Sequence, residues 1–125
     1  MSLVLDAGAF VAVERGDRDV VALIKRELTA ARAPRTHEAV VGQVWRGGAK
    51  QAALSRILAA VAIEPVDEAL ARRAGVLMGS ARTSDIVDAA LALLATDGDV
   101  VLTSDPKDLA RLLAAADLHV DLVRV

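Results

Sequence analysis

The chain has 125 residues, a length that allows one domain and leaves no room for a second. It contains no cysteine, which excludes a disulfide scaffold, a cysteine zinc site and a thiol nucleophile. A net charge of −2 excludes a uniformly basic coat for nucleic acid, and an aromatic content of 2% excludes an array of base-stacking side chains.

Short apolar runs alternate with stretches of helical periodicity. Three or four apolar residues in a row suit strands that are buried on both faces, and a period of 3.6 suits the helices that cover them. In chain order we expect a strand at 3–5, helices at 7–14 and 17–31, an extended segment, helices at 37–45 and 50–60, a strand at 61–66, helices at 68–78 and 84–95, a strand at 100–103, a helix at 106–116 and a strand at 118–125. This order predicts a three-layer α/β/α domain with a mainly parallel central sheet.

Hydroxyl residues and glycines indicate where several of these helices begin and end. Thr36 is expected to cap the helix that carries Glu38, because a threonine hydroxyl can accept from the free amides of the first turn. Gly79 is expected to close the helix before it, because glycine adopts the left-handed conformation without steric cost. Thr83 or Ser84 is expected to open the next, strongly apolar helix.

Neither a targeting segment nor a membrane segment is indicated. Asp6 ends the first apolar run after three residues, and no Lys or Arg precedes it, so we expect no signal peptide. The best candidate for a span, 86–95, is far shorter than the roughly 20 residues required and contains Asp88. We therefore expect a soluble cytoplasmic domain.

Five acidic residues fall where strands end or helices begin. In open parallel sheets, ligands bind beyond the carboxyl ends of the strands. Asp6 follows the first strand, Glu38 opens the helix after the second extended segment, and Asp105 follows the strand at 100–103. Asp85 and Asp88 are spaced i, i+3 at the start of a helix, so they share one face. These side chains could converge, and no basic residue obviously converges with them.

Such a cluster requires positive charge or protons. Two carboxylates about 4 Å apart repel by roughly 4 kcal/mol at an effective dielectric constant of 20. A nearby helix N-terminus offsets only about 0.3 to 1 kcal/mol for each acid. An all-oxygen carboxylate site suits Mg²⁺ or Mn²⁺, and such ions activate water and stabilise charge at phosphorus in phosphodiester cleavage.

Each acid alone also has a structural interpretation. Asp6 could be a turn or cap residue, and Glu38 could be a first-turn acid. For Asp85 and for Asp105, which precedes a proline, capping is the favoured interpretation. Asp88 favours function, because a carboxylate within an apolar helix costs stability unless it is paired or bound to a metal. The case therefore depends on the coincidence of positions.

Other polar residues are interpreted structurally. His37 and His119 lack spaced partners for a metal site, and Thr103 is interpreted as a capping or supporting hydroxyl rather than a nucleophile. Asp108 is interpreted as a first-turn helix acid, and Trp45 as a core or interface anchor.

Four basic residues flank the acids in the sequence and could hold phosphates, although an ordinary solvated surface explains them equally well. They are Arg35, Arg46, Lys50 and Arg82.

Three stretches, in this order and over nearly the whole chain, resemble PIN-domain ribonucleases. Residues 3–10 (LVLDAGAF) are similar to the family's opening motif, 88–92 (DAALA) to its central acidic helix, and 100–105 (VVLTSD) to its last motif. Glu38 fits the family's remaining acid. Within the family, the chain most resembles VapC-type toxins of type II toxin–antitoxin modules.

This resemblance implies one PIN-like domain over residues 1–125 that cleaves RNA with Mg²⁺ or Mn²⁺. Asp6, Glu38, Asp88 and Asp105 would be the catalytic and metal-binding acids. Asp85 would lie close by and could assist through water; Asp88 is preferred as the ligand because its following residues match the motif better. The four flanking basic residues would be RNA contacts. The resemblance also implies a VapB-type antitoxin partner and a homodimer.

The pattern departs from the family at Leu109, where many relatives carry Phe. Two other functions remain open. A non-catalytic PIN-like interaction module, whose acids only cap helices, predicts no stabilisation by divalent ions. An aspartate-based phosphotransfer domain would use Asp6, but no second aspartate lies two residues on, and Ser104 and Asp105 stand directly after the strand at 100–103, where a receiver domain has a lysine. A dinucleotide-binding fold is poorly supported, because no Gly-x-Gly-x-x-Gly follows the first strand.

Overall fold

The computed structural model describes residues 2–125, which form five strands, seven α-helices and one 3₁₀ turn at Ala49–Gln51. The strands are β1 (Leu3–Leu5), β2 (Arg35–His37), β3 (Ala62–Glu64), β4 (Val100–Thr103) and β5 (Asp121–Arg124). The helices are α1 (Ala7–Glu14), α2 (Arg18–Thr29), α3 (Glu38–Val44), α4 (Ala52–Ala60), α5 (Glu68–Ala81), α6 (Ile86–Leu94) and α7 (Pro106–Ala115). Within residues 2–125, no helix is long and apolar enough to cross a membrane.

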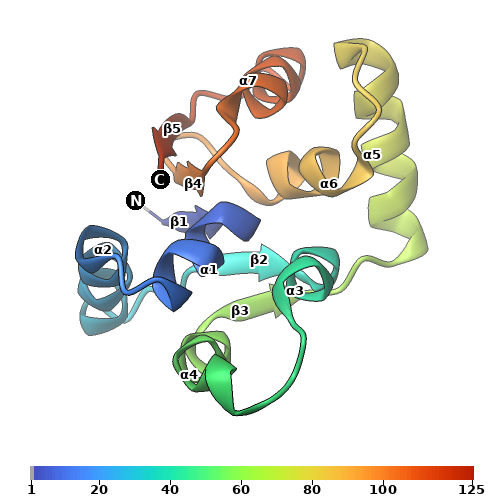
Figure 1. The fold of residues 1–125 in the computed structure, drawn as a ribbon. Coiled ribbons are helices and arrows are strands. Elements are labelled where there is room, and N and C mark those ends of the chain that lie inside the picture. The colour runs from blue at the N-terminus through green and yellow to red at the C-terminus, as the bar shows by residue number, and fades with distance from the viewer. Residues whose placement is uncertain (1) are drawn as a thin grey trace.

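The strands form a single sheet in the order β3-β2-β1-β4-β5, and every pairing is parallel (Figure 1). The prediction of an α/β domain with a parallel sheet is therefore confirmed. The chain builds outward from β1 on one side through β2 and β3, then returns to β1 and builds outward on the other side through β4 and β5. Since parallel crossovers are right-handed, α1 to α4 cover one face and α5 to α7 the other. The contacts of α1 with α2, α3 and α4, and those among α5, α6 and α7, agree with this arrangement.

The centre of the sheet is buried because its strands are continuous apolar runs. All three residues of β1 and the last three of β4 are buried. Phe10 of α1 packs over one face and Leu91 of α6 over the other, and both are fully buried. Leu109 stands at the position where many PIN-domain ribonucleases carry Phe, and it is also fully buried. The chain therefore keeps an apolar core residue at this position.

Three helix boundaries differ from the sequence prediction. Thr36 does not cap α3: it lies in β2, and its hydroxyl donates to the carbonyl of Leu5, while His37 is the cap. α5 runs through Gly79 to Ala81 and ends at Arg82, whose φ of 57° is left-handed. α6 is opened by Asp85 rather than by a hydroxyl residue. For Thr36 a tertiary hydrogen bond outweighed the local preference, whereas Asp85 caps α6 through local bonds of its own side chain.

The ends of the sheet also differ. β3 and β5 are shorter than expected, because Pro65 has no amide to donate and because residues 118–120 close a turn in which Leu118 N donates to Leu113 O. The expected helix at 50–60 begins as a 3₁₀ turn. Trp45 is 43% exposed, so it is not a core anchor, and its alternative interpretation as an interface anchor stays a prediction.

Candidate functional site

The point where the strand order reverses places Asp6 and Asp105 at neighbouring strand ends. Asp6 directly follows β1, and Asp105 follows β4, which pairs with β1. The amide of Asp6 donates to the carbonyl of Leu102 over 3.0 Å, so Asp6 is held against the end of β4. Ligands bind at such reversal points of open α/β sheets.

The carboxylate of Asp6 is fixed at both oxygens. Oδ1 accepts from the amide of Ala7 over 2.7 Å, which caps α1, and Oδ2 accepts from the hydroxyl of Thr103 over 2.7 Å. The Thr103 oxygen in turn accepts from the amide of Asp105 over 3.1 Å. Asp6 is 9% exposed. Thr103 is therefore a supporting hydroxyl, as the sequence indicated, and its proton is committed to Asp6.

Gly8 allows this close approach. A Cβ at Gly8 would lie 2.6 Å from Oγ and 2.7 Å from the backbone N of Ser104, far inside normal contact distance. The first turn of α1 therefore passes against the connection from β4 to α7 only because residue 8 has no side chain.

Asp85 and Asp88 have different roles at the start of α6. Oδ1 of Asp85 accepts from the amides of Val87 and Asp88 over 2.9 and 3.1 Å, so the capping interpretation is confirmed. Asp88 is half-buried in the first turn of the helix. Burial, and then the charges of nearby aspartates, raise the pKa of Asp88 to about 7; the aspartates are Asp85, Asp6, Asp108 and Asp105. A carboxyl group in this state favours a nearby cation.

The structure thus brings Asp6, Asp85, Asp88 and Asp105 into one electrostatic group, and it adds Asp108. Sequence reasoning missed Asp108, although its i, i+3 spacing from Asp105 is the spacing that drew attention to Asp85 and Asp88. Asp105 occupies the N-cap position of α7, as the sequence predicted, but its side chain makes no capping hydrogen bond.

Glu38 is held differently. It begins α3 directly after β2, beside the end of β1, and its side chain is exposed. Its Oε1 accepts from the amide of Val66, in the connection from β3 to α5, over 3.1 Å. Glu38 therefore lies at the same edge of the sheet as Asp6, but its carboxylate is occupied by a backbone contact.

His37 lies behind these acids and is fully buried. Its Nδ1 accepts from the amides of Ala39 and Val40, and its Nε2 lies 2.9 Å from the carbonyl oxygen of Val87. Burial lowers the pKa of His37, against smaller opposing effects of the Val87 carbonyl and of Asp6, so the ring is neutral at pH 7. These bonds all join His37 to backbone groups.

The acids suit a divalent cation in charge and in donor type. Within residues 2–125, the ion pairs of Lys, Arg and His side chains involve Glu27, Glu68, Asp97 and Asp99, and none involves the acids of this site. No three Asp, Glu or His side chains of the described chain are gathered closely enough to hold a metal ion as they stand. A complete set of ligands therefore requires exposed side chains such as Glu38 and Asp105 to turn inward.

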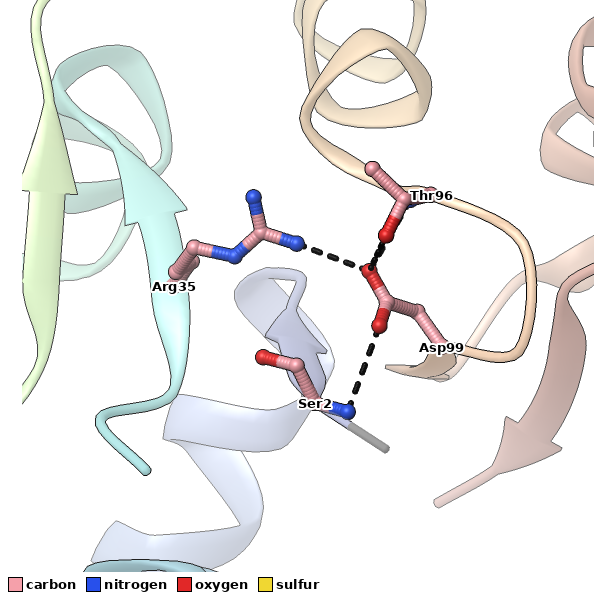
Figure 2. Close-up of polar contacts among 4 residues, drawn as sticks. All are labelled: Ser2, Arg35, Thr96 and Asp99. Atoms are coloured by element: carbon pink, nitrogen blue, oxygen red, sulfur yellow. Dashed lines mark hydrogen bonds and ion pairs between the residues drawn. The ribbon is translucent and has the colours of Figure 1, made fainter. Parts of the chain in front are cut away.

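Two of the four basic candidates are committed elsewhere. Arg35 binds Asp99 over 2.7 Å at the opposite, amino-terminal edge of the sheet, so its placement beside the acids was wrong (Figure 2). The guanidinium of Arg46 donates to the carbonyls of Gly42, Gln43 and Trp45 and closes the end of α3.

The other two basic candidates are exposed. Lys50 lies in the 3₁₀ turn, and Arg82 lies three residues before Asp85.

A separate apolar groove of about 430 Å³ lies between α1, α2 and α4. Its walls include Val13, Val21, Leu28 and Ile57. None of the acids described above lines it, so it is separate from the candidate site.

Comparisons with known proteins give the fold but no relative by sequence. No protein-family model and no curated protein matches the chain. Among solved structures, it is similar to a chain of the crystal structure of VapBC2 from Rickettsia felis bound to a DNA fragment from their promoter, with a TM-score of 0.69 and 12% identity. The match covers 98% of this chain and 99% of that chain. The chain therefore has the PIN-like α/β fold that its motifs predicted.

Proposed function

We propose that this chain is a metal-dependent endoribonuclease, the toxin of a VapBC-type toxin–antitoxin pair. The observation that carries the proposal is the group of carboxylates at the reversal point of the sheet, whose mutual repulsion helps to raise the pKa of Asp88 to about 7. The similarity in fold to a VapBC2 chain supports the assignment as a toxin.

Asp6 and Asp88 are the proposed direct ligands of Mg²⁺ or Mn²⁺, and Glu38 and Asp105 are proposed to complete the set. A carboxylate oxygen has about two acceptor sites, so each oxygen of Asp6 keeps one after its bond to Ala7 N or to Thr103. When bound, the ion supplies the positive charge that makes water a nucleophile and stabilises negative charge at the phosphate.

The other residues of the site act on these ligands. Thr103 and the amide of Ala7 hold the Asp6 carboxylate in one orientation, and Asp85 holds the first turn of α6, which carries Asp88. Asp108 adds negative charge, which favours a cation further. Exposed Lys50 and Arg82 are the proposed contacts to RNA phosphates.

The proposed partner is a VapB-type antitoxin, since the similar chain was solved within a VapBC2 complex. A homodimer, which the resemblance in sequence implies, and a cytoplasmic location are part of the same proposal.

Cleavage of total RNA by the purified chain, with Mn²⁺ or Mg²⁺ against EDTA, tests the proposal. Asp6→Asn is the decisive variant, because asparagine can still cap α1 but lacks the charge. Asp121→Asn, at an exposed position, is the control. We expect fragments that require the ion and disappear only in Asp6→Asn, with folding verified by circular dichroism. Full activity of a folded Asp6→Asn would overturn the assignment, and a wild-type chain that neither cleaves RNA nor binds Mn²⁺ would favour the interaction module.

A further inference from the structure

His37 makes contacts that a simple core residue does not need. It ends β2, is fully buried, and uses both ring nitrogens. A backbone amide can only donate, so Nδ1, which lies 3.2 Å from the amide of Ala39, is the acceptor. The proton of the neutral ring is therefore on Nε2, which donates to the carbonyl of Val87 over 2.9 Å.

This tautomer joins the first turns of two helices. Nδ1 caps α3, whose first residue is Glu38, and Nε2 bonds α6 at the residue before Asp88. Glu38 and Asp88 are 50 residues apart in the sequence, as are His37 and Val87. The imidazole ring of His37 nevertheless links the first turns of the two helices that carry these acids.

The choice of histidine at a helix cap is unusual. Ser, Thr, Asn and Asp are the preferred caps, and each could satisfy the amide of Ala39. None of them carries a second polar atom far enough out to reach Val87 at the same time. The hydrogen bond to α6 therefore explains why position 37 has a larger side chain with two polar ring nitrogens.

We propose that His37 is a positioning residue of the site: by bonding the first turns of α3 and α6 together, it sets the spacing between Glu38 and Asp88. The inference rests on the proposed function for its consequence, since ligand spacing matters only if these acids share an ion. Groups that orient metal ligands typically change affinity or activity 10- to 100-fold when they are removed.

Two substitutions test the two hydrogen bonds of His37 separately. In His37→Asn the amide oxygen stands near the place of Nδ1, so the cap on α3 is kept and the bond to Val87 is lost. In His37→Gln the amide nitrogen stands near the place of Nε2, so the bond to Val87 is kept and the cap is lost. His119→Asn, at an exposed histidine, is the control for the chemical change.

Three measurements on the full chain decide the matter: the Mn²⁺ dissociation constant by electron paramagnetic resonance, amide hydrogen exchange, and Tm. For His37→Asn we expect Mn²⁺ affinity to fall about tenfold or more, with faster exchange at Asp88 and Ala89 and unchanged protection at Ala39. For His37→Gln we expect the larger loss of Tm but a Mn²⁺ affinity closer to wild type.

A purely structural role would make Mn²⁺ affinity follow Tm in both variants, and that result would overturn the proposal. Unchanged exchange in α6 of His37→Asn would also overturn it. If the wild-type chain binds no Mn²⁺, the proposed nuclease function fails, and the exchange data still decide whether His37 fixes the first turn of α6.

Discussion

Aspartates at the two edges of the sheet have opposite electrostatic surroundings. At the amino-terminal edge, Asp99 is 4% exposed and accepts from the amide of Ser2, the guanidinium of Arg35, and both the amide and the hydroxyl of Thr96, over 2.7 to 3.2 Å (Figure 2). These contacts tie the starts of β1, β2 and β4 together. Both carboxylate oxygens of Asp99 therefore meet donors, one of which is the charged guanidinium of Arg35.

At the carboxyl-terminal edge, aspartates face one another. Burial of Asp88, and then the charges of four other aspartates, raise its pKa to about 7. The comparison teaches that Asp99 stabilises the fold through its protein partners, whereas the charged form of Asp88 costs stability, a cost that the proposed metal ion would offset.

Removing the compensated carboxylate should have the largest effect. Asp99→Ala leaves Arg35 partly buried without a counter-charge and leaves the amide of Thr96 without its acceptor. Breaking a buried ion pair from one side costs about 3 to 5 kcal/mol, so we expect a loss of about 3 kcal/mol in urea unfolding. Asp121→Ala, an exposed neighbour, should change stability by less than about 0.5 kcal/mol. Equal losses in both variants would contradict the comparison.

Divalent ions should stabilise only through the carboxyl-terminal edge. At a concentration about 100 times its dissociation constant, Mg²⁺ or Mn²⁺ would add about 2.7 kcal/mol to the free energy of unfolding. Thermal melts should show this gain for wild type and for Asp99→Ala, but not for Asp6→Asn. A similar rise in Tm with Na⁺ at matched ionic strength would show that salt screens the repulsion between carboxylates in general, without a specific ion site.

Asp88→Asn should stabilise the chain in the absence of metal, and the gain should depend on pH. Because the pKa of Asp88 rises from 3.8 to about 7 on folding, the folded chain keeps a proton that the unfolded chain releases. Wild-type stability from this group is therefore present below about pH 4 and lost as pH rises to about 7. Asparagine stays neutral, so we expect about 2 kcal/mol more stability than wild type at pH 8, after discounting for solvent screening, and little difference at pH 4.

Melts of both chains from pH 4 to pH 8 would measure the difference. If Asp88→Asn were less stable than wild type at pH 8, the charged form of Asp88 would be stabilised by its surroundings in the folded chain, against this prediction.

Gly8→Ala should have a smaller effect on stability and a specific effect on the site. The added methyl would meet Ser104 at 2.6 Å, which pushes α1 away from the end of β4. Overpacking of this kind typically costs about 1 to 3 kcal/mol, and we expect about 1 kcal/mol together with weaker Mn²⁺ binding. Gly75→Ala meets nothing within 4 Å in an exposed part of α5, so it should add about 0.5 kcal/mol. Equal Mn²⁺ affinity in both variants would remove the link between Gly8 and the site.

The sequence predicted what depends on local pattern. The apolar runs placed β1 and β4 correctly, and the positions of Asp6, Asp85 and Asp88 at strand and helix ends predicted their convergence. Contacts between distant segments were not predictable in this way. Nothing near Arg35 in the sequence points to Asp99, 64 residues on.

The same limit explains the cap of α3. Thr36 matches the local rule for a cap, yet its hydroxyl is drawn to the carbonyl of Leu5 in β1, and His37 takes its place. Asp108 was missed for a related reason: its charge becomes important only when α7 packs beside α6. Tertiary packing decided the assignments that the sequence left wrong.

The hydrogen bond between Thr103 and Asp6 joins residues 97 positions apart, and β1 lies at the centre of the sheet although it is made first. A ribosome therefore releases Asp6 long before the strand that orients it. Until β4 has emerged, β1 lacks a neighbour on one side, and Asp105 has not yet been added to the chain. An unfinished polypeptide of this kind carries Asp6 without the hydroxyl that orients it, so the proposed site would form only after β4 and Asp105 have been made.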